Sequence, residues 1–249
     1  MLALLAAGGG LLGAPLPLSA MRGEVRKPRV VVELFTSQGC SACPPADALL
    51  ASLVREPDIL GIGYNIDAWD YLGWRDTLAR PEFTRRQREY ARARGDDAVY
   101  TPQMIINGQA HVVGNDRRQV LALIKKARDS GGCQLVNMQA RRHKKVLQIN
   151  IAPAAASLMD QVETSHPEAT LWMITMRRQV AVRIRRGENR GRKIAYHQVA
   201  RHISPVAMWH GKPLRLMLPV MEVMRDDADS CAILLQLNGY GPILAAAAL

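Results

Sequence analysis

Two cysteines, Cys40 and Cys43, are separated by two residues and stand directly before Pro44 and Pro45. Proline is tolerated in the first turn of a helix, so a helix is predicted to begin at the second cysteine. Free backbone N–H groups and the positive end of the helix dipole favour a thiolate there, and the thiolate is the nucleophile in disulfide exchange. The pair therefore predicts a redox-active dithiol or disulfide, with Cys40 attacking and Cys43 resolving the mixed disulfide.

Two other interpretations of this pair stay open, an inert structural disulfide and one half of a zinc site. A zinc site needs a second pair of Cys or His ligands. The nearest downstream histidine, His111, has no partner at ligand spacing. We therefore expect neither a metal nor another cofactor.

An acid, Glu33, lies within an apolar run seven residues before Cys40. In a buried strand its carboxyl group would be desolvated, and we include it in the site as a group that could relay a proton to Cys43. A structural acid in a salt bridge fits the sequence equally well.

The segments around these residues alternate between strand and helix. The β-branched apolar run at 29–35 is typical of a central strand. Further elements are predicted from periodicity, helix-start prolines and an Asn-Gly turn: helices at 44–54, 81–94 and 116–128, a strand at 59–66, and a hairpin at 103–113. This order gives a mixed sheet with flanking helices, so residues 28–130 are predicted to form an α/β thioredoxin-like fold.

Thr101-Pro102 stands directly before the predicted hairpin. The thioredoxin fold has a cis-proline at this place, beside the dithiol, where the preceding backbone is free to pair with a bound polypeptide. Although trans bonds are far commoner before proline, we expect a cis bond here and include Pro102 in the site.

From Cys133 onward the pattern changes to strands without convincing helices. Strands are predicted at 134–140, 145–151, 170–176, 180–185, 193–202, 213–218 and 231–237. We therefore predict a second, small all-β domain at 133–249, similar to a sandwich, with Gly131-Gly132 as the junction.

The other two cysteines, Cys133 and Cys231, each open one of these strands. An even number of cysteines in an exported chain permits two disulfides, and we expect a structural disulfide between this pair. Two buried free thiols are one alternative. A third redox thiol at Cys133 is another.

The net charge of +11 comes mainly from the second half of the chain. Residues 28–132 hold 14 basic and 13 acidic side chains, whereas residues 133–249 hold 16 and 8. Aromatic residues make up only 5%, and no basic run is interleaved with them as in single-strand binders. We therefore expect no nucleic-acid partner.

The densest basic segment is 183–193, which contains one acid, Glu188. A solvated turn is the simplest interpretation. Alternatively, Asn189 shapes a turn whose arginines dock on the first domain or bind an anionic group. The residues proposed for such contacts are Arg186, Asn189, Arg190 and Arg192.

The N-terminal segment 1–20 has no charged residue, contains apolar runs and two prolines, and ends in Leu-Ser-Ala. This composition predicts a secretory signal peptide, with an uncleaved anchor as the alternative. No other stretch approaches 18 consecutive apolar residues, so no stable membrane span is expected after signal cleavage. The protein is predicted to be periplasmic or secreted.

Three segments carry a resemblance to a known group of proteins: 31–47, which includes Gly-Cys-Ser-Ala-Cys-Pro-Pro-Ala-Asp, 100–104, and 186–192 with the following His197. They resemble the signature of a bacterial family of secreted, thioredoxin-like proteins whose function is formally unassigned. Ala42 departs from the serine that the family often has, which bears on the redox potential and leaves the dithiol intact. The resemblance implies a thioredoxin-like fold and leaves the substrate open.

Together these features predict an exported protein similar to thiol–disulfide oxidoreductases, acting on a protein or small-molecule thiol or disulfide. The alternative is a non-catalytic binding module on the same scaffold, with a structural disulfide. Fold by itself does not choose between the two.

Overall fold

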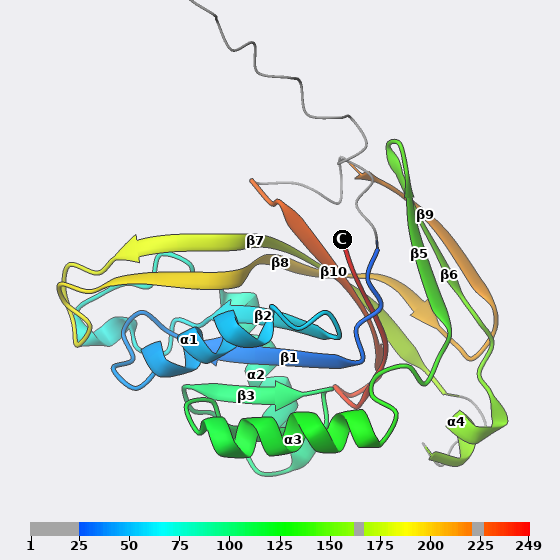
Figure 1. Cartoon of the computed structure of the whole chain (residues 1–249), viewed down its shortest axis with the longest axis horizontal. Helices are drawn as coiled ribbons and strands as arrows, with labels where there is room; N and C mark the ends of the chain where they lie inside the picture. Colours follow the sequence, from blue (N-terminus) through cyan, green and yellow to red (C-terminus); the bar gives the residue numbers. More distant parts are fainter. Residues whose placement is uncertain (1–24, 162–166, 221–226) are drawn as a thin grey trace, which may run out of the picture.

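The computed structural model describes residues 25–161, 167–220 and 227–249 of the chain (Figure 1). The predicted signal peptide, residues 1–20, lies outside these residues. Within the described ranges, no helix is long and apolar enough to cross a membrane.

The elements of the first half follow the sequence prediction closely. In chain order they are β1 (Val30–Thr36), α1 (Pro44–Leu53), β2 (Ile59–Asn65), a 3-10 turn (Asp70–Leu72), α2 (Pro81–Arg94), β3 (Gln103–Ile106), β4 (Ala110–Val113) and α3 (Arg117–Asp129). Local signals explain this agreement. Both α1 and α2 begin with proline in the first turn, and Asn107-Gly108 forms the turn between β3 and β4 with positive φ angles.

Strand β1 lies in the middle of a mixed sheet and is buried on both faces. It pairs in parallel with β2 and antiparallel with β3, which in turn pairs with β4. Its side chains alternate: Val32 and its even-numbered neighbours pack against α1 and α3, whereas Val31 and Phe35 pack on the side of α2. Helices α1 and α3 therefore cover one face of the sheet and α2 the other (Figure 1).

The second half consists mainly of strands. Its elements are β5 (Met138–His143), β6 (Val146–Ile151), α4 (Ala156–Gln161), β7 (Ala169–Arg183), β8 (Lys193–Trp209), β9 (Leu214–Pro219), β10 (Ser230–Leu237) and β11 (Ile243–Ala248). Three features differ from the prediction: α4 and β11 were not expected, and β7 is one long strand instead of two. The alanine-rich β11 has a weak strand propensity, and its burial against β10 decides its conformation.

The two predicted domains, 28–130 and 133–249, share one sheet. Its eight strands have the order β11-β10-β7-β8-β2-β1-β3-β4, so β8 of the second half continues the sheet beside β2 of the first. The junction is also tightly packed, since a Cβ at Gly132 would collide with the carbonyl of Arg29. Strands β2 and β8 pair in parallel at Gly63 and Val199.

A second, three-stranded antiparallel sheet has the order β5-β6-β9. Its buried residues, such as Leu147 and Ile149, form one hydrophobic cluster with Leu171, Ile233 and other residues of the large sheet. The small sheet therefore covers the β7-β10-β11 end, on the right of Figure 1. Two layers of strands are present there, as in a sandwich, but one layer belongs to the sheet that runs through the whole molecule.

The expected disulfide between Cys133 and Cys231 is wrong, because both cysteines are free. Cys133 lies in the same cluster as Ala232, whereas Cys231 lies in the cluster under the small sheet. Since successive strand residues point to opposite faces, the two thiols lie on opposite sides of the sheet. Burial raises the pKa of each thiol to about 12, which disfavours the thiolate form of both.

Candidate active site

The two cysteines of the CxxC segment lie between β1 and α1, as the sequence predicts. Cys43 is the N-cap residue of α1, and Cys40 follows a short turn after the last residue of β1. The two form a disulfide with a Cα–Cα distance of 5.4 Å. The sulfur atoms therefore lie at the end of a helix where unpaired N–H groups and the helix dipole stabilise negative charge.

This disulfide is covered almost completely. Cys43 is 0% exposed and Cys40 is 5% exposed. A turn nearly 150 residues further along the chain, between β7 and β8, contacts the CxxC segment. We call residues 183–193 the β7–β8 tip.

Asn189 of the β7–β8 tip holds the CxxC segment directly. Its Nδ2 donates hydrogen bonds to the carbonyl oxygens of Gln38, at 3.0 Å, and Cys40, at 2.8 Å, and the side chain is 0% exposed. The neighbouring Glu188 carboxylate accepts a hydrogen bond from the backbone N–H of Ser41 at 3.1 Å. The predicted docking of this segment is therefore made by Asn189 and Glu188.

The arginines proposed for docking, Arg186, Arg190 and Arg192, do not make it. All three are exposed, and none forms an ion pair or side-chain hydrogen bond with any residue that the structure describes. The charge of the tip is therefore turned toward the solvent.

The peptide bond between Thr101 and Pro102 is cis, as expected from the sequence. Pro102 lies near the first turn of α1, since a Cβ at Gly114 would contact both Pro102 and Ala46 at 3.2 and 3.3 Å. Trp69 joins the two loops of the site: its Nε1 donates to Thr101 Oγ1 at 2.6 Å, and its Cβ lies against Gly39.

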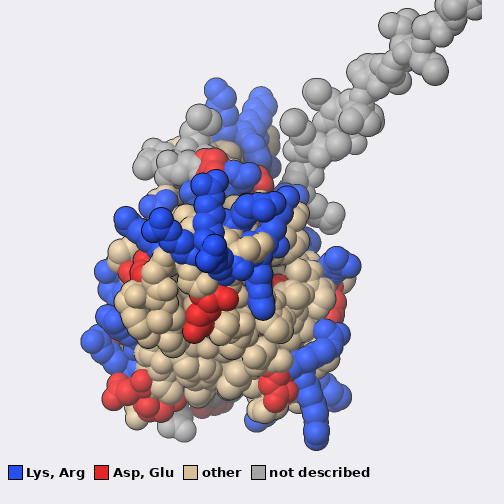
Figure 2. All heavy atoms as spheres, turned by 90° about the vertical axis from the view of Figure 1, so that its left-hand side faces the viewer, with Lys and Arg blue, Asp and Glu red and all other residues tan. Residues whose placement is uncertain are grey.

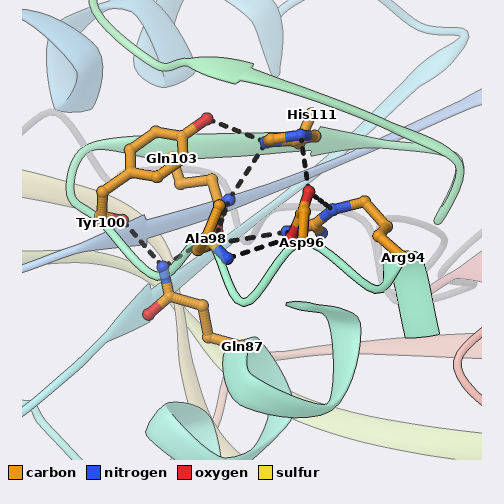
Figure 3. Close-up of polar contacts among 7 residues, drawn as sticks. All are labelled: Gln87, Arg94, Asp96, Ala98, Tyr100, Gln103 and His111. Carbon is orange, nitrogen blue, oxygen red and sulfur yellow. Dashed lines mark hydrogen bonds and ion pairs between the residues drawn. The ribbon is translucent and has the colours of Figure 1, made fainter. Parts of the chain in front are cut away.

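A network of polar side chains fixes the loop that leads to Pro102 (Figure 3). Gln87 of α2 donates to the carbonyl of Tyr100 at 2.8 Å and to the side chain of Gln103 at 2.9 Å. His111 of β4 accepts from or donates to the Tyr100 hydroxyl at 2.9 Å and lies 3.3 Å from Asp96. The loop is thus held from both α2 and β4, which gives His111 a positioning role.

Glu33 forms a salt bridge, which is the second of the two interpretations that the sequence left open. Its side chain points to the α2 face of the sheet, where it pairs with Arg86 at 2.7 Å and accepts a hydrogen bond from Tyr90. Helix α1, which begins after Cys43, packs on the other face. The salt-bridged alternative is therefore correct. Successive side chains of β1 point to opposite faces of the sheet, so Glu33 lies on the α2 face and not on the face that α1 covers.

The acid that lies near the cysteines is Asp47, which the sequence did not single out. It lies one turn after Cys43 in α1, and helical side chains tilt toward the N-terminus, so its carboxyl group lies over the turn that contains Cys43. Asp47 is 3% exposed, and its Oδ2 has no hydrogen-bond partner among the described residues. Burial raises the pKa of Asp47 well above its usual range, and the nearby Asp76 carboxylate adds to this effect.

Asp76 is the more extensively hydrogen-bonded member of this acid pair. Its oxygens accept hydrogen bonds from the backbone N–H groups of Gln38, Leu78 and Ala79 and from the side-chain amide of Asn65. Burial raises the pKa of Asp76, and these four donors oppose the shift. Burial disfavours the charge on both carboxyl groups, and the four donors lessen this effect at Asp76.

The signal for Asp47 in the sequence is its spacing. It follows Cys43 by four residues, which places both on one face of the predicted helix. Asp76 gives no such signal, since it lies in a loop that meets the CxxC segment only in the folded chain. Within the described ranges, no group of three His, Cys, Asp or Glu side chains is arranged to hold a metal ion.

Comparison with known sequences identifies one family. A family described as "Protein of unknown function (DUF1223)" matches residues 31–236, which include the CxxC segment and the β7–β8 tip. No curated protein sequence matches the chain.

Two solved structures resemble this one. The X-ray structure of protein AGR_C_4864 from Agrobacterium tumefaciens has 32% sequence identity and a TM-score of 0.73, and the match covers 89% of this chain and 94% of that one. HBP35 of Porphyromonas gingivalis has 11% identity and a TM-score of 0.55, over 90% of this chain and 75% of that one. At 11% identity the likeness concerns the fold alone.

Proposed function

The chain belongs to the DUF1223 family, and we propose that it is a thiol–disulfide oxidoreductase whose first half is a thioredoxin-like unit. Strands β2, β1, β3 and β4 lie side by side with helices on both faces, the CxxC disulfide begins α1, and a cis-proline precedes β3. These features support the thioredoxin-like assignment.

The observation that carries the redox proposal is the buried acid beside the disulfide. Asp47 lies one turn from Cys43 and is 3% exposed, although burying an ionisable carboxyl group is unfavourable. A purely structural disulfide needs no proton donor or acceptor. A resolving thiol does, because only its thiolate attacks the mixed disulfide.

The reaction runs through two exchange steps when the protein starts in its reduced form. The Cys40 thiolate attacks one sulfur of a substrate disulfide, so that a Cys40–substrate disulfide forms and the other substrate sulfur leaves as a thiolate and takes up a proton. Cys43 then passes its proton to the carboxylate of Asp47, one helical turn away. The Cys43 thiolate attacks Cys40 Sγ, which forms the intramolecular disulfide and releases the second substrate thiolate.

This sequence leaves the substrate reduced by two electrons and the protein oxidised by two. It is reversible, so the oxidised protein accepts electrons from a substrate dithiol by the same steps in reverse. Repeated turnover requires a second dithiol or disulfide that returns the cysteine pair to its starting state.

We also propose that the protein acts outside the cytosol, in the periplasm or after secretion. The apolar segment 1–20 supports this compartment, and so does the Cys40–Cys43 disulfide, because disulfides persist in oxidising environments.

One observation favours a second candidate function, a binding module with a structural disulfide. Cys40 is only 5% exposed, whereas an attacking thiol needs access to its substrate. Under this alternative the β7–β8 tip closes the disulfide permanently. Under the oxidoreductase proposal the tip opens.

The two candidates are distinguished by trapping. Reduced Cys43→Ser in the full chain should accumulate mixed disulfides with disulfide-containing proteins from a periplasmic extract, and Cys40→Ser should abolish exchange with a model peptide disulfide. Cys133→Ser is the matched control, since this thiol is buried and we expect no effect on exchange. If wild type exchanges with no disulfide and Cys43→Ser traps nothing, the oxidoreductase proposal is lost. A reduction potential below about −300 mV would agree with that outcome.

A further inference from the structure

The β7–β8 tip brings a dense positive charge to the disulfide. Six cations and one acid lie within its eleven residues: Arg183, Arg185, Arg186, Glu188, Arg190, Arg192 and Lys193. The acid is engaged with the CxxC segment through the N–H of Ser41. All six cationic side chains are exposed, and none is paired with an acid in the part of the chain that the structure describes.

The space-filling view of this end of the molecule shows the same imbalance. Figure 2 faces the left side of Figure 1, where β7 and β8 meet near the start of α1, and Lys and Arg side chains gather over its upper part. The positive charges of the β7–β8 tip lie close together, and no acid among the described residues pairs with them. Two charges 4 Å apart repel by about 1 kcal/mol in bulk water and by about 4 kcal/mol at the effective dielectric of a protein surface. An anionic partner would relieve this repulsion.

We propose that the β7–β8 tip recruits acidic polypeptides to the Cys40–Cys43 pair. The inference rests on the proposed exchange function and specifies its substrate class. Asn189 and Glu188 anchor the tip on the CxxC segment, so the tip that carries these arginines adjoins the segment that reacts. Acidic residues that flank a substrate cysteine would meet the tip when that cysteine reaches Cys40.

A polypeptide fits this surface better than the other polyanions. Nucleic acids and anionic lipids carry no thiol or disulfide for Cys40, and the tip contains no aromatic side chain on which bases could stack. The backbone N–H and carbonyl of Thr101, beside cis-Pro102, form no hydrogen bond within the described residues. They are free to pair with an extended substrate chain, as main-chain groups do when a peptide adds to an exposed strand.

The test measures exchange between the reduced full-length protein and three synthetic peptide disulfides. The peptides share one cystine core and carry four aspartates, four serines or four lysines beside it. Electrostatic steering raises association rates by about 10- to 1,000-fold, so we expect the acidic peptide to exchange at least about tenfold faster than the basic one in low salt. The difference should shrink toward unity in 1 M salt, because the Debye length falls to about 3 Å.

Two variants with the same change in net charge locate the effect. Arg186→Glu/Arg190→Glu reverses charge at the tip, and Lys144→Glu/Lys145→Glu reverses it on the turn between β5 and β6 at the other end of the molecule. The ratio of the acidic-peptide rate to the basic-peptide rate should fall at least about fivefold in the tip variant and keep its wild-type value in the other. Using a ratio cancels any change in the accessibility of the disulfide.

The outcomes separate this inference from the proposed function. Exchange with all three peptides at equal rates, or an equal loss of preference in both variants, would overturn the inference and leave the oxidoreductase intact. Absence of exchange with every peptide would remove the proposed function and the inference with it. Equal peptide rates together with tip-dependent sedimentation on phosphatidylglycerol vesicles would assign the tip to a membrane surface instead.

Discussion

Replacing Asn189 by alanine should uncover the disulfide. Asn189 is 0% exposed, and its Nδ2 supplies the hydrogen bonds to the carbonyl oxygens of Gln38 and Cys40. Alanine removes both donors and leaves two carbonyls without partners whenever the tip is closed. The closed position is thereby destabilised relative to an open one, in which water satisfies these carbonyls.

The size of the effect follows from the two hydrogen bonds. Each contributes about 0.5–1.5 kcal/mol net, so the closed state loses about 1–3 kcal/mol in total. A shift of that size changes an equilibrium by about 5- to 150-fold. If a nucleophile reaches Cys40 only in the open state, the rate of disulfide reduction should rise by the same factor, because that rate is proportional to the open population.

The assay uses tris(hydroxypropyl)phosphine, a neutral reductant whose attack is not steered by the charges of the tip. Reduction of the native protein is followed by quenching with an alkylating reagent and measuring the intact mass. Asn107→Ala is the matched control. Asn107 is 5% exposed, and its Oδ1 accepts a hydrogen bond from the backbone N–H of Val31 at 2.7 Å, away from the disulfide. It should lower stability without accelerating reduction.

A rate for Asn189→Ala within about twofold of wild type would refute the reasoning, because two lost hydrogen bonds would then have no effect on access. An equal acceleration in Asn107→Ala would also refute it, since general loosening would explain the result. Comparing the rates with the melting temperatures of all three proteins separates local opening from global unfolding.

Four further outcomes are expected. Burial raises the pKa of Asp47 above its unfolded value. The stability linked to its proton is therefore fully present below pH 3.8 and is lost as pH rises through the folded pKa. In chemical denaturation from pH 4 to 8, the free energy of unfolding should fall less steeply with pH for Asp47→Asn than for wild type. In the same variant, release from the mixed disulfide should slow by at least about tenfold, since general bases contribute about 10²–10⁴-fold; an unchanged rate would remove the acid pair from the mechanism. Arg86→Met leaves the carboxylate of Glu33 buried without its cation, which should cost about 3–5 kcal/mol in urea denaturation while the potential of the disulfide stays the same. Without reductant, an alkylating reagent should label Cys133 and Cys231 only after denaturation, because both are free and buried. If the intact mass shows that neither cysteine is alkylated under denaturing conditions, the two thiols are not free.

Local signals in the sequence determined the elements that carry the cysteines. The β-branched run of β1, the prolines that open α1 and α2, and the Asn-Gly turn between β3 and β4 each act over a few residues, and tertiary packing reinforces them. The CxxC segment and Pro102 could be found in this way, because their chemistry depends on position relative to a strand end and a helix start.

The limits of local signals are visible in the second half. An alanine-rich run such as β11 has no strand periodicity, and only burial beside β10 makes it a strand. The pairing of β8 with β2 joins residues more than 130 positions apart, so no short-range pattern announces that two predicted domains share a sheet.

The surroundings of the site were decided by tertiary structure alone. Periodicity shows that Glu33 is buried, but its partner Arg86 comes from α2 and lies on the face away from the disulfide. Likewise, the sequence shows a basic turn around Asn189, but only the folded chain brings Asn189 to Cys40. The physical reason is that periodicity specifies conformation and the buried face of an element. Which faces meet depends on packing and hydrogen bonds between segments distant in the chain.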